Sequence, residues 1–91
     1  MPVKSVYLIV GGRVQGVGYR YFVVHKAHEL NIFGWVRNTP DGNVEIEAEG
    51  ESKNLEIFLD CMKIGPARAI VRSFSVSEIT PVRNFTSFTI R

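Results

Sequence analysis

The segment that decides the fold is Gly11-Gly12-Arg13-Val14-Gln15-Gly16-Val17-Gly18-Tyr19-Arg20, which holds four of the eight glycines in this 91-residue chain. An apolar run from Val6 to Val10 precedes it and is typical of a strand, with apolar residues on both faces as in the interior of a sheet. Apolar residues at helical spacing follow it from Tyr19 to Leu30. The segment is therefore predicted to be a glycine-rich loop between the end of a strand and the start of a helix.

A loop of this kind is suited to binding an anion. Glycine allows positive φ angles and a close approach of the backbone to a ligand, and the first N–H groups of a helix have no intrahelical partner. The helix dipole favours negative charge at the same place, so phosphate is the natural ligand. Arg20, in or beside the first helical turn, offers a planar guanidinium that can bind phosphate through two hydrogen bonds.

Two observations limit this interpretation of the loop. Glycine-rich turns between a strand and a helix often only reverse the direction of the chain, and a short glycine pattern alone is weak evidence for a ligand. The loop is also not a nucleotide-binding P-loop, because no Gly-Lys-Ser or Gly-Lys-Thr sequence closes it.

Charge and cysteine content exclude several classes of protein. The net charge of +2 is too small to indicate a general nucleic-acid binder, and it fits a small anionic substrate at least as well. Cys61 is the only cysteine, which excludes an intrachain disulfide and a cysteine-rich metal site. His25 and His28 are three residues apart on the predicted helix, but the sequence offers no obvious third ligand for a metal. We therefore interpret the two histidines as solvated or capping residues and expect no metal site.

The sequence also predicts where the protein works. We expect no export signal, because the N-terminal region lacks a long apolar core after a basic segment. No apolar run approaches the ~20 residues that a membrane span needs. The expectation is a cytoplasmic monomer that binds a small molecule and neither nucleic acid nor membrane.

A β-hairpin is predicted after the first helix. Residues 32–38 have the composition of a strand, and the turn sequence Thr39-Pro40-Asp41-Gly42 leads into an alternating strand at 44–49. In that second strand Glu45, Glu47 and Glu49 alternate with apolar residues. The alternation predicts that the three carboxylates share one solvated face.

A second helix is predicted between Ser52, placed at the N-cap, and the stop signal Gly65-Pro66. Its buried stripe consists of Leu55, Phe58, Leu59 and Met62. Cys61 on the same helix is interpreted as buried filler and not as a nucleophile. A strand at about 70–79 follows, whose imperfect alternation suggests a bulge, and a short strand at about 85–90 ends the chain.

The resulting order is β-α-β-β-α-β plus a short C-terminal strand. This is the split βαβ, or ferredoxin-like, pattern. We therefore predict an α+β fold in which residues 1–91 form a single domain, a sandwich with two helices on one face of an antiparallel sheet.

Three motifs give the chain a resemblance to the acylphosphatase family. One is the run from Gly12 to Arg20; the others are Gly34-Trp35-Val36-Arg37-Asn38 with Gly42, Val44 and Gly50, and Gly65-Pro66 with Ala69 and Val71. The resemblance covers essentially the whole chain. It implies hydrolysis of acyl phosphates to a carboxylate and phosphate, without a metal or cofactor.

The resemblance also implies site residues. Arg20 matches the family's phosphate-binding arginine, and Asn38 matches the asparagine that positions the attacking water. The loop whose backbone amides cradle the phosphate is matched by Gln15, Gly16, Val17, Gly18 and Tyr19. By its position alone Asn38 is also explained as a turn residue at the end of a strand, but a split βαβ fold allows the ends of the first two strands to meet.

These residue types suit the chemistry. An acyl phosphate already has a good leaving group, so the site mainly has to hold the phosphoryl group, spread its charge and aim a water in line. Arg20 and the loop supply the first two functions, and the Asn38 amide can orient water without being a strong base. We hypothesise that the phosphate itself takes the proton.

Three other functions fit parts of the pattern. An RNA-binding sheet would need an aromatic strand motif that the central strands lack, and a metallochaperone of this fold would need paired loop cysteines. A domain that only binds an acyl or carbamoyl phosphate shares every motif with the enzyme. Only a turnover measurement separates that last alternative from catalysis.

Overall fold

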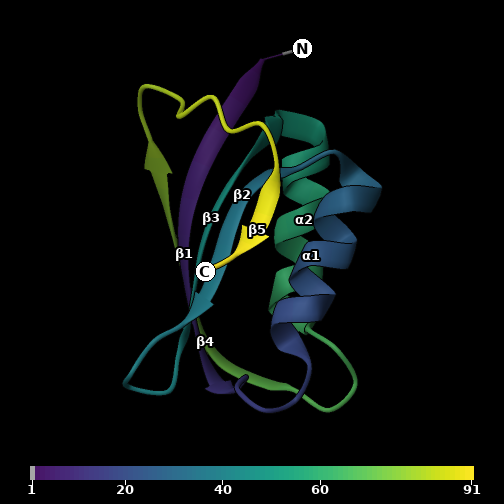
Figure 1. Cartoon of the computed structure of the whole chain (residues 1–91), viewed down its shortest axis with the longest axis vertical. Helices are drawn as coiled ribbons and strands as arrows, with labels where there is room; N and C mark the ends of the chain where they lie inside the picture. Colours follow the sequence, from purple (N-terminus) through teal and green to yellow (C-terminus); the bar gives the residue numbers. More distant parts are fainter. Residues whose placement is uncertain (1) are drawn as a thin grey trace.

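The computed structural model describes residues 2–91 and places two helices against one five-stranded sheet (Figure 1). The strands are β1 (Val3–Arg13), β2 (Phe33–Asn38), β3 (Val44–Glu51), β4 (Ile70–Ile79) and β5 (Phe88–Ile90). The helices are α1 (Tyr19–Leu30) and α2 (Ser52–Ile64), and both cover the same face of the sheet. The predicted order of elements and the two-layer α+β architecture are confirmed. Neither helix of the described chain is long and apolar enough to cross a membrane.

The strands lie in the order β4-β1-β3-β2-β5. The first three neighbouring pairs are antiparallel, but β5 runs parallel to β2, so the prediction of a wholly antiparallel sheet is wrong at this edge. The reason is topological. Because β4 ends where β2 begins, a chain that crosses directly to the far edge must enter β5 in the direction of β2 (Figure 1).

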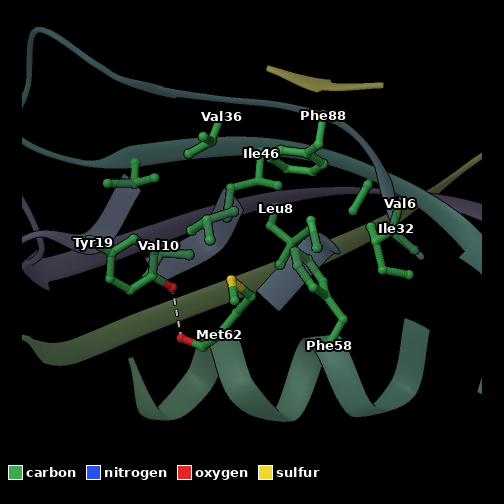
Figure 2. Packing of buried hydrophobic residues seen from close by; sticks show 14 of the residues in the cluster. Val6, Leu8, Val10, Tyr19, Ile32, Val36, Ile46, Phe58, Met62 and Phe88 are labelled. Atoms are coloured by element: carbon green, nitrogen blue, oxygen red, sulfur yellow. Dashed lines mark hydrogen bonds between the residues drawn. The ribbon is translucent and has the colours of Figure 1, made fainter. Parts of the chain in front are cut away.

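A continuous apolar core fills the space between the sheet and the helices (Figure 2). The sheet contributes alternate residues of β1 and β3, as period-2 patterning requires, and Leu8, Val10, Val44, Ile46 and Ala48 are fully buried. The helices contribute Tyr19, Val23 and Ala27 from α1 and Leu55, Phe58 and Met62 from α2. The predicted stripes are thus largely confirmed; Leu30 and Leu59, at their margins, are only half-buried.

Element boundaries differ from prediction in several places. The strand β2 begins at Phe33, one residue later than expected, and β3 continues to Glu51. The strand β1 extends on both sides of the apolar run at 6–10, and β5 is limited to its last three residues. Placing Ser52 at the N-cap of α2 is wrong, because Glu51 occupies that position without capping through its side chain. Ser52 is instead the first helical residue, and its N–H donates to the Pro2 carbonyl at 3.0 Å.

The suggested bulge in the strand at 70–79 is present. Between the pairs Gly11–Ser73 and Gly12–Val71 the register shifts, which makes Arg72 the additional residue on β4. Gly12 has φ +122°, and a Cβ there would lie 2.2 Å from the Ile70 carbonyl oxygen. Only glycine therefore fits opposite the bulge.

The glutamates of β3 share one face, as predicted, but that face is not simply solvated. Glu45 accepts hydrogen bonds from the Tyr7 hydroxyl and from Arg37 Nε. Glu47 pairs with Arg83 Nε at 3.2 Å, and the side chains of both glutamates are only 14% exposed. Alternation places side chains on a face, but it does not show which partners lie there.

Glu49 departs furthest from the expected solvated state, since it is only 5% exposed. Its two carboxylate oxygens accept hydrogen bonds from the backbone N–H groups of residues 83–85, at 2.7 to 3.1 Å. These residues belong to the segment that connects β4 to β5. Glu49 therefore fixes the crossing segment to the sheet, and the prediction of a solvated carboxylate is wrong here because distant backbone donors cover it.

Candidate active site

The loop between β1 and α1 owes its glycines to backbone conformation and not to crowding. Gly16 and Gly18 have φ of +73° and +80°, and a Cβ built on either would meet no atom within 4 Å. On the inner side, Val14 is buried and Val17 packs against the core. The loop is thus held from within while its glycines face open space, where a ligand can approach the backbone.

No side chain caps the N-terminus of α1. Gly18 occupies the N-cap in the left-handed conformation, and the first turn of the helix contains no acidic residue. The Phe22 N–H donates to the Gly18 carbonyl at 3.1 Å, so the preceding N–H groups have no intrahelical acceptor. Because these groups and the helix dipole favour negative charge, the end of the helix is suited to an anion.

Arg20 lies in this uncapped first turn. It is half-buried, and among residues 2–91 no carboxylate lies within ion-pairing distance of it. Its neighbour Tyr19 has a different role: the ring is buried and its hydroxyl donates to the Met62 carbonyl at 2.7 Å (Figure 2). Tyr19 therefore fixes the start of α1 to α2, while Arg20 keeps a guanidinium without a carboxylate partner.

Asn38 is the last residue of β2, and the sheet register brings it to the same edge as the loop. Val44 of β3 is paired with Asn38 on one side and with Val10 of β1 on the other. Since β1 and β2 are both antiparallel to β3, they run in the same direction and end at the same edge of the sheet. With strands ~4.8 Å apart, Asn38 and Val10 lie ~10 Å apart. Both strands therefore run to the same edge of the sheet, with β3 between them, as the split βαβ order allows.

The Asn38 side chain has an unused acceptor. Its Oδ1 is buried without a hydrogen-bond partner, one of two such side-chain atoms in the described part of the chain. By strand alternation the side chain lies on the same face as the core residue Val36, which is the face covered by the helices. A buried amide oxygen without a donor is costly for the fold, so a water or ligand donor at this position is favoured.

Gln15 connects the two parts of the site. Its side-chain Nε2 donates to the carbonyl oxygens of Thr39 and Asn43, both at 2.8 Å. The β2–β3 turn is itself braced, because the Thr39 N–H donates to the Asn43 carbonyl at 2.9 Å and the Asn43 N–H donates to Thr39 Oγ1 at 3.0 Å. The loop is thereby tied to the turn that directly follows Asn38.

This tie is a function of Gln15 that sequence reasoning missed. The sequence assigns Gln15 only to the backbone cradle of the loop. Its side-chain acceptors are main-chain carbonyls 24 and 28 residues away, and carbonyls are present at every position. Only the fold identifies which carbonyls lie within reach, so no sequence signal identifies this contact.

The remaining candidate groups lie outside the site. His25 and His28 are exposed on α1, and among residues 2–91 no group of three or more His, Cys, Asp or Glu side chains gathers as a metal site would require. Cys61 on α2 is half-buried and packs against the core, which agrees with its interpretation as packing.

Comparison with known proteins shows which family the chain belongs to. The family model described as Acylphosphatase matches residues 6–90. The chain belongs to the acylphosphatase family. It is 48% identical over 89 residues to the acylphosphatase of Methanospirillum hungatei, covering 97% of each chain. It is 47% identical over 79 residues to that of Chlorobaculum tepidum, covering 87% of this chain and 86% of the relative.

Solved structures show the same relationship in three dimensions. The crystal structure of acylphosphatase from Bacillus subtilis superimposes with a TM-score of 0.94 at 41% sequence identity. The match covers 97% of this chain and 98% of the other. The acylphosphatase family and its ferredoxin-like fold are therefore shown for nearly the whole chain.

Proposed function

We propose that this protein is an acylphosphatase that hydrolyses the carboxyl–phosphate bond of acyl phosphates. Family membership supports the activity, because relatives named acylphosphatase match this chain over 86–97% of their own length. The observation that carries the mechanism is the juxtaposition of an uncapped helix start, the unpaired Arg20 and the partnerless oxygen of Asn38. We further propose that residues 1–91 act as one domain, in the cytoplasm.

The phosphoryl group binds at the loop. The backbone N–H groups from Gln15 to Tyr19 surround its oxygens, and the Arg20 guanidinium donates two hydrogen bonds to them. Donors that the folded backbone holds in a fixed arrangement stabilise the charge that develops on the phosphoryl oxygens with little reorganisation. Losing one such donor typically slows catalysis by about 10²–10³-fold.

Asn38 positions the nucleophile. A water donates a hydrogen bond to Asn38 Oδ1 and keeps that proton, while its oxygen attacks phosphorus in line with the leaving group. The new P–O bond forms as the bond from phosphorus to the acyl oxygen breaks, and the carboxylate leaves with the bonding electrons. The second water proton passes to a phosphoryl oxygen. The step needs no general acid, because a carboxylate is a stable leaving group, and we propose that it needs no metal.

The decisive experiment measures hydrolysis of a model acyl phosphate, such as benzoyl phosphate, by the purified protein in EDTA. Turnover in EDTA that is lost in Arg20→Ala supports the proposal. Arg20→Lys is expected to lose most turnover as well, since lysine keeps the charge but not the planar pair of donors. Near-normal turnover in Arg20→Lys would contradict the two-pronged contact. A folded protein that binds phosphate without turnover would be a binding domain.

Asn38→Ala separates water positioning from substrate binding. We expect kcat to fall while the inhibition constant of inorganic phosphate stays the same, because the substitution removes none of the proposed phosphate donors. If phosphate affinity falls as much as kcat, Asn38 is a binding or structural residue. The retained far-UV circular dichroism spectrum serves as the control for folding.

A further inference from the structure

Two stretches of the sequence carry positive charge without any acidic residue. Residues 1–28 and 61–77 hold seven of the eleven lysines and arginines and none of the nine acidic residues. The fold places these stretches side by side, because β1 pairs with β4 and the Tyr19 hydroxyl of α1 donates to the Met62 carbonyl of α2. Positive charge therefore gathers where the two stretches meet, and neither stretch supplies a carboxylate to balance it.

Three of these basic residues lie at the end of the molecule that carries the β1–α1 loop (Figure 1). Arg13 is the last residue of β1, Arg68 lies in the connection from α2 to β4, and Arg72 is the third residue of β4. All three are exposed. Within residues 2–91 the ion pairs are made by other side chains, namely Lys26 with Glu29, Arg37 with Glu45 and Arg83 with Glu47. The three guanidinium groups are therefore available to an anion.

The β-bulge directs Arg72 to the root of the loop. Arg72 is the additional residue at the register shift between Gly11 and Gly12, so it leaves the regular alternation of β4. A Cβ built on Gly12 would lie 3.2 Å from Arg72 Cγ, which means that the stem of this arginine lies against the Gly12 backbone. Bulges beside active sites commonly redirect a side chain. Because Arg13 follows Gly12, both arginines lie beside the first residues of the loop.

This placement is unfavourable unless an anion is bound. Arg13 is paired with Ile70, only two residues from Arg72, so two like charges lie close together on neighbouring strands. Like charges on paired strands destabilise a sheet. An anion between the two arginines would replace this repulsion by attraction, and the planar guanidinium is well suited to carboxylate and phosphate groups.

The proposed reaction directs the acyl group toward the same arginines. In-line attack places the water, the phosphorus and the leaving oxygen on one line. Because the water is held at Asn38, at the end of β2, the leaving group points away from β2. In the strand order β4-β1-β3-β2-β5, the strands beyond β3 on that side are β1 and β4, which carry Arg13 and Arg72.

We propose that Arg13 and Arg72 form a second anion-binding position, which recognises a further carboxylate or phosphate on the acyl part of the substrate. The inference rests on the proposed function, because the direction of the acyl group follows from the attack of water held by Asn38. Arg68 adds positive charge to the same side, and charge of one sign around a site raises the local concentration of an oppositely charged substrate. The substrate class is thus an acyl phosphate that carries a second anionic group.

Two non-hydrolysable phosphonates test this position by binding alone. Benzoylmethylphosphonate replaces the bridging oxygen of benzoyl phosphate by a methylene group, and its para-carboxy derivative adds one carboxylate. Isothermal titration calorimetry is expected to show that the carboxy compound binds about fivefold more tightly, as one or two exposed ion pairs allow. The preference should disappear at about 1 M ionic strength, where the Debye length is ~3 Å. Equal dissociation constants at low salt overturn the proposal.

Charge-removing variants locate the preference on the molecule. Arg13→Gln and Arg72→Gln should each reduce it to about twofold, and the double variant should abolish it. The matched control is Lys53→Gln, which removes one exposed positive charge from the start of α2, at the opposite edge of the sheet, and should keep the preference. Persistence of the preference in the double variant, or its equal loss in Lys53→Gln, overturns the proposal. Circular dichroism controls for folding.

Turnover separates this inference from the proposed function. A protein that prefers the carboxy phosphonate but hydrolyses neither benzoyl phosphate nor para-carboxybenzoyl phosphate keeps the second anion position and is not an acylphosphatase. A protein that hydrolyses both esters with the same kcat/KM, and binds both phosphonates equally, is an acylphosphatase without a second anion position.

Discussion

Gln15 offers the sharpest test of how the two halves of the site are held together. Replacing it by methionine keeps nearly the same volume and removes both side-chain donors to the Thr39 and Asn43 carbonyls. Neither carbonyl is left without a donor. Thr39 O still accepts from the Gly42 N–H at 3.2 Å, and Asn43 O still accepts from the Thr39 N–H at 2.9 Å. The substitution therefore removes the tie without leaving a carbonyl unpaired.

The expected loss of stability follows from the two hydrogen bonds that the substitution removes. Each lost hydrogen bond contributes about 0.5–1.5 kcal/mol, so Gln15→Met should lower the free energy of unfolding by about 1–3 kcal/mol. For a domain of this size that corresponds to a fall in Tm of roughly 5–20 °C. The turn that follows Asn38 also becomes free to move relative to the loop. We expect kcat to fall about tenfold with little change in KM, as for a positioning residue.

Urea denaturation and steady-state hydrolysis of an acyl phosphate measure the two effects. Thr39→Val is the matched control, because it removes the hydroxyl contacts within the turn and keeps the acceptor of Gln15. It should lose stability with a smaller loss of kcat. If the unfolding free energy of Gln15→Met falls by less than about 0.5 kcal/mol and kcat is unchanged, the Gln15 hydrogen bonds contribute neither to stability nor to positioning.

Four further substitutions test the fold around the site. Gly34→Ala should prevent folding, because the new Cβ would lie 1.9 Å from the Glu47 carbonyl oxygen. Its control is Gly42→Ala, whose Cβ would meet no atom within 4 Å and which should lower the free energy of unfolding only by the ~1–2 kcal/mol that a non-glycine residue costs in the left-handed conformation. Thermal melts of the two variants measure the difference. Glu49→Gln should cost about 1–3 kcal/mol in urea, since an amide NH₂ must then oppose a backbone N–H donor. Burial raises the pKa of Tyr19, so the unfolded chain loses that proton first and stability should fall by about 1.4 kcal/mol per pH unit above pH ~10. Tyr19→Phe should remove this part of the alkaline loss, and an unchanged slope would show that Tyr19 titrates normally.

Local sequence patterns predicted most of the fold for identifiable reasons. The helix at Tyr19–Leu30 was predicted with its observed bounds, since its apolar spacing and the glycine before it act within a few residues. The β2–β3 hairpin was similarly marked by its turn residues. The parallel pairing of β5 and the burial of Glu49 depend instead on where a long connection crosses the sheet. Such distant contacts leave no periodic signal in the sequence.

The candidate site divides in the same way. Arg20 and the loop could be proposed as an anion site because strand, glycines and helix are contiguous, and Asn38 because its motif resembles that of a known family. The shared edge of the sheet follows from the split βαβ order, and the register through Val44 bears it out. The Gln15 tie and the missing partner of Asn38 Oδ1 required the fold, because both concern main-chain or solvent groups.

The row formed by Val10, Val44 and Asn38 has a consequence for how such a site can change during evolution. Its width is set by two backbone ladders, and no exchange of side chains alters the distance between hydrogen-bonded strands. Evolution can therefore change the spacing between the β1–α1 loop and the β2–β3 turn only by inserting or deleting residues at 14–18 or 39–43. Point substitutions can act instead on exposed side chains of the first turn of α1, such as Tyr21, which is 76% exposed. New substrates should accordingly be gained through such exposed side chains, while the distance from Asn38 to the strand that carries the proposed phosphate loop stays constant.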